Sequence, residues 1–424
     1  MEQRRFLIAS LVTIVIVRLG IIVATPHSTQ LDDLRIYQGT GKVVLAGLNP
    51  YDFDTARERR DALRRSMAPA TPGPDLFTDT AEEWNYYVSS NLPASTALYA
   101  GFEWLSRGSG FLWRLFFIAG DVGIFLGLYS LIRTVKGTVA DKADQLGIVA
   151  LSVLNPVLLV SGCAIPEDKQ FQTALMLFAA SALLGQGRRS AAVLGMGTGV
   201  LLSLATLFKA FGIFLLPVWL QRARTAGFRY VLGSVAGAAV PAVLAVLWFG
   251  TAFFTTVGAR AASNSFTGAI HASPWVLLPG LAPGTYLFVK STVVLACSAL
   301  LAYRWRQQQI DLLNLCAGLC LVFVTLWLDR GAMNRMNIGI VFATAALASV
   351  DAVAWYLLAL GTAAASALAY VGGYALLHWR LESIDAVLTT IFLASYLAVM
   401  LALPFTRRLS AASIGAAMQP HGQH

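Results

Sequence analysis

Residues 353–377 read VAWYLLALGTAAASALAYVGGYALL, a run without a single charged side chain. Residues 146–162, LGIVALSVLNPVLLVSG, form a second uncharged run. About 20 apolar residues in a helix are enough to cross the hydrocarbon core of a bilayer, which is about 30 Å thick. Because backbone amides in lipid must bond within their own segment, we expect these runs to be helices. A β-barrel would need alternating apolar and polar residues in pieces of about 10 residues, which these runs exclude.

The composition of the whole chain agrees with many such runs. Of its 424 residues, 57% are hydrophobic and 12% are charged, which is about half the charged share of a soluble protein. We therefore expect an all-α polytopic membrane protein with about 12 transmembrane segments. These are expected near 6–24, 111–133, 146–163, 170–185, 190–220 (two short helices), 230–249, 286–303, 311–328, 336–350, 353–377 and 384–403.

The net charge of +9 could suggest a nucleic-acid partner. The basic residues, however, fall in small clusters between the apolar runs, which is how a membrane protein marks its cytoplasmic side. Arg4 and Arg5 predict a cytoplasmic N-terminus, and the clusters together put both termini inside. The chain then has a long first outer loop, 25–110, which we expect to bear short interfacial helices. Cys316 and Cys320 have no His or further Cys beside them, so no zinc site is predicted.

Residues 190–220 lie between two basic clusters that should both be cytoplasmic. The chain must therefore enter the membrane and return within about 30 residues, too few for two full crossings at 1.5 Å per residue. We expect two short helices that meet near Lys209, about midway or toward the outer face. Broken helices at membrane depth are tolerated where they line a cavity within the protein.

Most ionisable groups near the membrane fall on the predicted outer side. Charged groups at membrane depth are costly and indicate a functional site. A carboxylate can accept a proton from a hydroxyl nucleophile, and cations can hold a phosphate as it leaves. The candidate residues on this side are Asp32, Asp33, Tyr37, Tyr51, Glu167, Asp168, Lys169, Lys209, Arg260, His271, Arg330 and Arg335.

Plainer interpretations exist for several of these groups. Asp32 or Asp33 could only cap a helix that begins near Leu34, and Asp168 with Lys169 could form a solvated turn. Lys209 could extend its ammonium to the membrane interface. Inside the second span, Asp121 is expected to pair within the bundle, with Arg18 or Arg114.

The stretch LDDLRIYQGTGKVVLAGLNPYDF, residues 31–53, resembles the start of the first outer loop of GT-C glycosyltransferases. The closest resemblance is to bacterial polyprenyl-phosphate-mannose-dependent α-mannosyltransferases. In that family an Asp is followed four residues later by an aromatic residue, then by a helix of small residues and by Gly-x-x-Pro-Tyr. The matching residues here are Asp33, Tyr37, Gly47, Pro50 and Tyr51.

Weaker matches continue to about residue 280. Asn155-Pro156 followed by Glu167 and Asp168 resembles the family's Asn-Pro…Asp segment, although the usual His or Gln before the acid is missing. Lys209 and Pro217 resemble its Lys…Leu-Pro segment, and Ser273-Pro274-Trp275 resembles its outer-loop Ser-x-Trp element. A Tyr-Pro-Pro type segment is matched only loosely, by Asn85-Tyr86-Tyr87 and Leu92-Pro93.

The resemblance implies inverting transfer of a sugar, expected to be mannose, from a polyprenyl-phosphate donor to a hydroxyl of a glycolipid or glycan. Asp33 would be the general base, with Asp32 as the alternative, and neither a metal nor a cofactor would be needed. Lys169, Lys209, Arg330 and Arg335 would hold the donor phosphate. The implied substrate-binding residues are Tyr37, Tyr51, Glu167, Asp168, Arg260, His271 and Trp275.

The resemblance also divides the chain into a catalytic module, 1–250, and a C-terminal transmembrane module, 251–424. It implies an active site that faces the outside, and the compact loops and two-sided charge bias suit a bacterial plasma membrane. Two other classes stay open. A transporter or lipid flippase would hold ionisable groups near the midplane and have repeated halves. An O-antigen-type ligase or polymerase would have a large late outer loop, whereas here the largest outer loop comes first.

Overall fold

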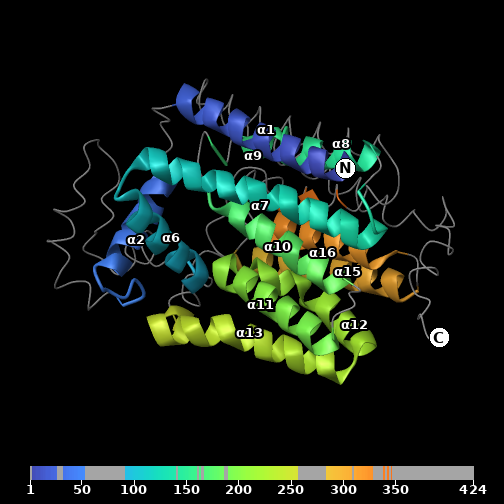
Figure 1. Ribbon diagram of the computed structural model, residues 1–424. Helices are drawn as coiled ribbons and strands as arrows, with labels where there is room; N and C mark the ends of the chain where they lie inside the picture. Colours follow the sequence, from blue (N-terminus) through green and yellow to red (C-terminus); the bar gives the residue numbers. More distant parts are fainter. Residues whose placement is uncertain are drawn as a thin grey trace.

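The computed structural model describes residues 2–25, 32–52, 91–139, 142–159, 162–163, 167–185, 190–255, 283–307 and 310–327, with isolated positions between 338 and 345. Within these ranges the chain forms only helices and turns (Figure 1). The helices are α1 (Glu2–Ala24), α2 (Asp32–Leu45), α6 (Pro93–Ser106), α7 (Gly110–Lys136), α8 (Lys142–Ser152), α9 (Pro156–Leu159), α10 (Lys169–Leu184), α11 (Ala191–Lys209), the 3-10 helix η2 (Phe211–Leu215), α12 (Leu216–Ala226), α13 (Phe228–Phe249), α15 (Pro283–Arg306) and α16 (Leu312–Trp327).

Several of these helices are long and apolar enough to cross a membrane. Among the described residues they are α1, α7, α11, α13 and the part Phe288–Arg306 of α15. Large apolar side chains are exposed along them, such as Leu247 at 76% and Trp248 at 61% on α13. Surfaces of this kind suit lipid rather than water, and the chain is an all-α membrane protein. The spans expected at 353–377 and 384–403, and most of 336–350, lie outside the described residues.

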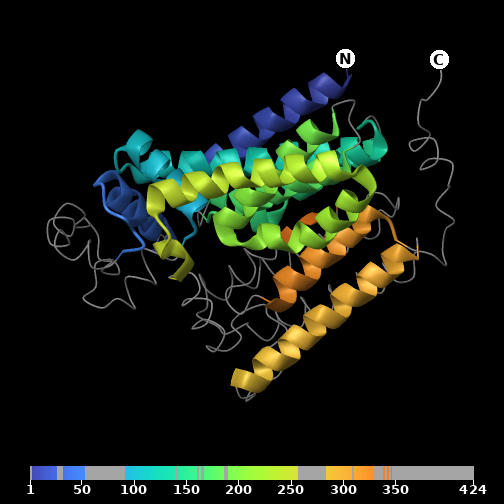
Figure 2. The ribbon, with the colours of Figure 1, turned by 90° about the horizontal axis from the view of Figure 1, so that it is seen from below.

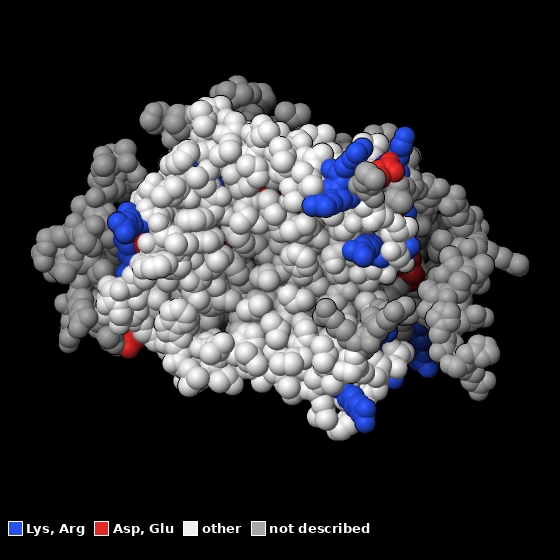
Figure 3. Space-filling model, viewed as in Figure 1, with Lys and Arg blue, Asp and Glu red and all other residues white. Residues whose placement is uncertain are grey.

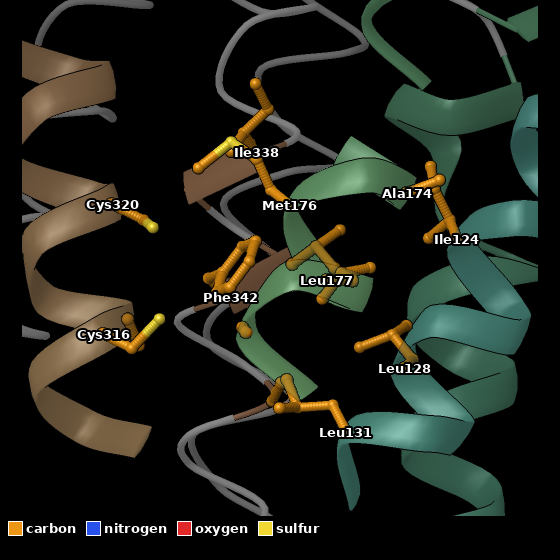
Figure 4. Packing of buried hydrophobic residues seen from close by; sticks show 14 of the residues in the cluster. Ile124, Leu128, Leu131, Ala174, Met176, Leu177, Cys316, Cys320, Ile338 and Phe342 are labelled. Atoms are coloured by element: carbon orange, nitrogen blue, oxygen red, sulfur yellow. The ribbon is translucent and has the colours of Figure 1, made fainter. Parts of the chain in front are cut away.

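The centre of the bundle is the parallel pair α7 and α10. A Cβ built on Gly120 would lie 2.8 Å from the Cβ of Gln170, and one on Gly127 would lie 2.8 Å from the Cβ of Leu177. Glycine therefore lets the two helices approach closely over several turns. Figure 4 shows the apolar side chains of α7 and α10 facing one another, with α16 on the other side of α10. Figure 2 shows α15 beside α16 at one flank of the bundle.

Small residues also join α11 to α13. A Cβ added at Gly195 would collide with the carbonyl oxygen of Tyr230, and one added at Gly237 would collide with that of Met196. Inside a bilayer the hydrophobic effect does not drive helices together. Close backbone contact of this kind is then the main source of helix pairing. These glycines therefore let α11 and α13 lie in close backbone contact.

The segment expected as one span at 146–163 is interrupted and does not form one continuous helix. The helix α8 ends at Ser152, and α9 begins only at Pro156. Proline has no N–H to continue a helical ladder, and it pushes the residue before it away from helical geometry. The Asn-Pro pair that supported the family resemblance is thus also the reason that this segment breaks.

Arg18 bonds to the end of the interrupted helix. Its guanidinium donates to the carbonyl oxygens of Ser152 at 2.7 Å and Val153 at 2.6 Å, and its Nε lies 2.9 Å from Oδ2 of Asp121. Arg18 and Asp121 are both fully buried. The prediction that Asp121 pairs within the bundle is confirmed, with Arg18 as its partner. Arg114 instead donates to main-chain oxygens elsewhere.

The segment 190–220 differs in part from its prediction. The helix α11 has 19 residues and is long enough to cross a membrane by itself, so it is not a short half-helix. It ends at Lys209 because Ala210 adopts a left-handed conformation with φ 63°. The chain then returns through η2 and α12. The prediction of a break near Lys209 is therefore confirmed.

The two ends of the bundle differ in charge. The last turns of α7, α12 and α15 carry Lys or Arg, and these ends lie on the same side as the N-terminus of α1 (Figure 1). Figure 3 shows most blue atoms at that end and a broad uncharged band across the middle. The opposite end holds α2, α6 and the beginnings of α7 and α10.

Candidate functional site

Asp168 is the centre of a polar cluster at the less basic end of the bundle. Its carboxylate is fully buried, and three side chains from other helices converge on it. Nζ of Lys209 lies 2.6 Å from Oδ1. The hydroxyl of Tyr37 donates to Oδ1 at 3.3 Å, and that of Tyr99 donates to Oδ2. We call these four residues, together with Glu167 and Lys169, the Asp168 cluster.

The local sequence explains how these side chains come together. Tyr37 of α2 stacks on Tyr99 of α6, with ring centroids 4.6 Å apart. One turn later on α2, a Cβ at Gly41 would lie 2.6 Å from the carbonyl oxygen of Tyr99, so only glycine lets the two helices pack this closely. Lys209 is the last residue of α11, and its Nζ also lies 6.0 Å from the centre of the Tyr37 ring.

The two neighbours of Asp168 in the sequence complete the cluster. Lys169 pairs with Glu167 through its Nζ, which also lies 3.8 Å from Oδ1 of Asp168. Glu167 is 4% exposed and Lys169 is 6% exposed. A solvated turn with an exposed ion pair, which the sequence also allowed, is therefore wrong for this segment. The two carboxylates and the two lysines balance one another in charge.

The surroundings keep the Asp168 carboxylate ionised. Burial raises its pKa, but Lys209 and Lys169 lower it, as do hydrogen bonds from Lys209 and Tyr99. The sum of these effects holds the pKa of Asp168 below its usual value. A carboxylate bonded in this way is a fixed negative charge that orients its cations rather than a group that exchanges protons near neutral pH.

The Gly-x-x-Pro-Tyr segment that follows α2 and ends at Tyr51 connects α2 to other helices. The hydroxyl of Tyr51 donates to the carbonyl oxygen of Asn91 at 2.7 Å and lies 2.9 Å from Oγ1 of Thr96. Asn49 donates through Nδ2 to the carbonyl oxygen of Phe249 at 2.8 Å. Burial raises the pKa of the Tyr51 phenol above its usual value, so the hydroxyl stays a donor. These bonds fix the segment after α2 against α6 and α13.

The structure brings five of the predicted site residues together. They are Tyr37, Glu167, Asp168, Lys169 and Lys209. Asp32 and Asp33 begin α2, one turn before Tyr37, but their side chains lie outside the described part of the structure. The same holds for Arg260, His271, Trp275, Arg330 and Arg335 as whole residues.

Sequence reasoning missed Tyr99 and its neighbours on α6. Glu103, one turn after Tyr99, is 5% exposed and accepts a hydrogen bond from Nε1 of Trp113 at 2.8 Å. A tyrosine and a glutamate four residues apart in an otherwise apolar helix lie on one face. That spacing was a signal for a buried polar face, and it was hidden by the interpretation of 25–110 as one polar loop.

No protein-family model matches the chain, and no curated protein matches it. The chemistry open to the site therefore follows from its geometry. Lys209 has 22% of its side chain exposed, against 7% for Lys169. An ammonium that is bonded to a buried carboxylate and is still partly exposed can attract an anionic group such as a phosphate.

Proposed function

We propose that the chain is an inverting glycosyltransferase of the GT-C type that uses a polyprenyl-phosphate-linked sugar. The observation that supports this proposal is the convergence at Asp168. It joins α2, the turn before α10 and the last residue of α11. These are the three segments to which the family resemblance assigns the base, the substrate-binding acids and a phosphate-binding lysine.

In the proposed reaction, Asp33 takes the proton of the acceptor hydroxyl as its oxygen attacks the anomeric carbon. The bond between that carbon and the phosphate oxygen breaks, and its electron pair leaves with the lipid phosphate. Position 33 precedes Tyr37 by four residues on α2, and positions four apart share a helix face. That spacing favours Asp33 over Asp32 as the base.

Lys209 is the proposed cation for the leaving phosphate, with Arg330 and Arg335 as further candidates. A cation positioned in advance stabilises developing negative charge without reorganisation. Asp168 acts as a positioning residue in this scheme, since it holds Nζ of Lys209 at 2.6 Å. Mannose is the sugar that the resemblance implies, and the acceptor would be a glycolipid or a glycan.

The charge distribution supports an outward-facing site. Basic residues mark the cytoplasmic side of a membrane protein, and here they gather at the end of the bundle opposite to α2 and α6 (Figure 3). The Asp168 cluster would then face the outside, with the N-terminus in the cytoplasm. A bacterial plasma membrane is the proposed location.

The variant Asp33→Asn tests the proposal. Asparagine is nearly isosteric and keeps the ability to cap α2, but it cannot act as a base. In membranes supplied with polyprenyl-phosphate mannose and a glycolipid acceptor, we expect sugar transfer to fall about 10²–10⁴-fold. Asp52→Asn, the same change in the segment after α2, is the matched control and should keep its activity. A normal rate for Asp33→Asn, with intact expression and elution profile, would remove Asp33 as the base.

A further inference from the structure

A groove of about 660 Å³ opens between α2 and α6. Its walls include Lys42 and Leu45 of α2, and Glu103, Trp104, Leu105 and Arg107 from α6 and the residue after it. We call it the α2–α6 groove. It lies at the end of the bundle where Figure 3 shows a small group of blue atoms apart from the larger basic end.

The charges of the groove do not cancel. Glu103 is the one carboxylate in its lining, and one of its oxygens already accepts from Nε1 of Trp113 at 2.8 Å. The other oxygen lies 3.9 Å from Nζ of Lys42, whose side chain is 32% exposed. Within the described residues, Arg107 makes no ion pair and no side-chain hydrogen bond, and it is exposed. The groove therefore offers an excess of positive charge to an anion.

The backbone at Arg107 forms a left-handed cap at the end of α6. Arg107 follows the last residue of α6 and adopts a left-handed conformation with φ 50°. Glycine is the residue that usually occupies this position after a helix, because it alone adopts this conformation without steric cost. A glycine at position 107 would therefore suit this backbone at least as well as arginine does.

Apolar side chains flank the two cations. Trp104 is 69% exposed, Leu105 is 55% exposed and Leu45 is 49% exposed. The groove also adjoins the beginning of α7, one of the helices long enough to cross the membrane. Tryptophan and basic residues gather at this level of a bilayer, where headgroups meet acyl chains. A soluble anion would use the cations but would leave these apolar side chains without a partner.

We propose that the α2–α6 groove binds the headgroup of an anionic phospholipid from the surrounding bilayer. Lys42 and Arg107 contact the phosphate oxygens, and Trp104 and Leu105 contact the first part of the acyl chains. The site is separate from the proposed sugar transfer and does not depend on it. Because Tyr37 and Tyr99 lie on the same two helices, the lipid would also hold α2 against α6.

Quenching of Trp104 fluorescence by brominated lipids tests this site on the full chain in vesicles. The vesicles contain equal parts of phosphatidylglycerol and phosphatidylcholine, with only one of the two brominated in its acyl chains. The signal of Trp104 is the difference between the intact chain and Trp104→Phe. We expect phosphatidylglycerol to be preferred about tenfold at Trp104, because it carries a net negative charge, whereas Lys42 and Arg107 repel the choline cation of phosphatidylcholine.

Arg107→Gly is the decisive variant. Glycine suits the left-handed backbone at this position, so the variant should keep or raise its midpoint of thermal unfolding in phosphatidylcholine alone. It should nevertheless lose the preference for phosphatidylglycerol, as should Lys42→Gln. Arg224→Gln, which removes a basic residue in the last turn of α12 at the opposite end, should keep the preference.

Three results would overturn the proposal. One is an unchanged lipid preference in Arg107→Gly. Another is equal quenching by both lipids in the wild-type chain, which would make the groove an apolar contact with the bilayer. The third is loss of the preference on addition of millimolar inorganic phosphate, which would assign the groove to a soluble phosphate rather than to a lipid.

Discussion

Lys209 and Asp168 form an ion pair in which only the lysine reaches the surface. Nζ lies 2.6 Å from Oδ1, the carboxylate is fully buried, and 22% of the lysine side chain is exposed. The pair connects the end of α11 to the beginning of α10. A buried charge is costly unless it is paired, so Lys209 stabilises the fold as well as being available to an anionic ligand.

Replacing Lys209 with Met should therefore destabilise the protein. Removal of one partner from a buried pair costs about 3–5 kcal/mol, and the loss should lie at the lower end because Lys169 also lies near Asp168. The double variant Lys209→Met/Asp168→Asn removes both charges and should recover much of the loss. Denaturant unfolding in detergent measures both free energies. A double variant no more stable than the single one would show that the pair does not couple in this way.

Acid should weaken the Asp168 cluster. The pKa of Asp168 is lowered in the folded protein, so the carboxylate binds a proton more readily in the unfolded chain. Its contribution to stability is complete above the ordinary pKa of about 3.9 and is lost as the pH falls toward the lower folded-state pKa. Asp168→Asn should therefore flatten the acid side of the profile of stability against pH. Identical acid slopes in the two proteins would contradict the prediction.

Tyr99→Phe tests the residue that sequence reasoning missed. The Tyr99 hydroxyl donates to a buried carboxylate, and losing such a bond to a charged group costs about 1.5–3 kcal/mol. Tyr37→Phe is the matched control, because its hydroxyl lies 3.3 Å from the same carboxylate and should contribute less. Thermal unfolding of both variants gives the comparison. A larger loss of stability in Tyr37→Phe than in Tyr99→Phe would contradict this prediction.

The sequence predicts the parts of this fold that depend on local pattern. Apolar runs predict α7, α13 and α16 to within a few residues, because a span needs a fixed length of apolar helix. The break at Pro156 was missed because hydropathy does not record where a backbone N–H is absent. The full length of α11 was missed because the helix continues until the chain turns sharply at Ala210. That turn depends on the left-handed conformation of a single residue, which hydropathy does not show.

The candidate site was predictable only as a set of segments. Order along the chain put Tyr37, Asp168 and Lys209 on one side of the membrane, and the structure brings these three together. The contribution of Tyr99 requires knowing that α6 packs on α2 at Gly41, a contact between distant parts of the sequence. Periodicity alone cannot supply such a contact.

Arg18→Met should be more damaging than its ion pair alone implies. Arg18 bonds to Asp121 and also to the carbonyl oxygens of Ser152 and Val153, where α8 is interrupted. The double variant Arg18→Met/Asp121→Asn removes the unpaired charge but still leaves two buried carbonyls without Arg18. We therefore expect only partial recovery from a loss of about 3–5 kcal/mol. Full recovery in denaturant unfolding would mean that the carbonyl bonds contribute little.

Two glycines on α11 allow a matched test of helix pairing. A Cβ at Gly195 would collide with the carbonyl oxygen of Tyr230, whereas one at Gly197 would meet nothing within 4 Å. Gly195→Ala should therefore separate α11 from α13 at a cost of about 1–3 kcal/mol. Gly197→Ala should gain up to about 1 kcal/mol, because alanine is the better helix former. Unfolding midpoints in the same detergent measure the difference, and equal midpoints for the two variants would show that close approach at Gly195 does not hold the pair together.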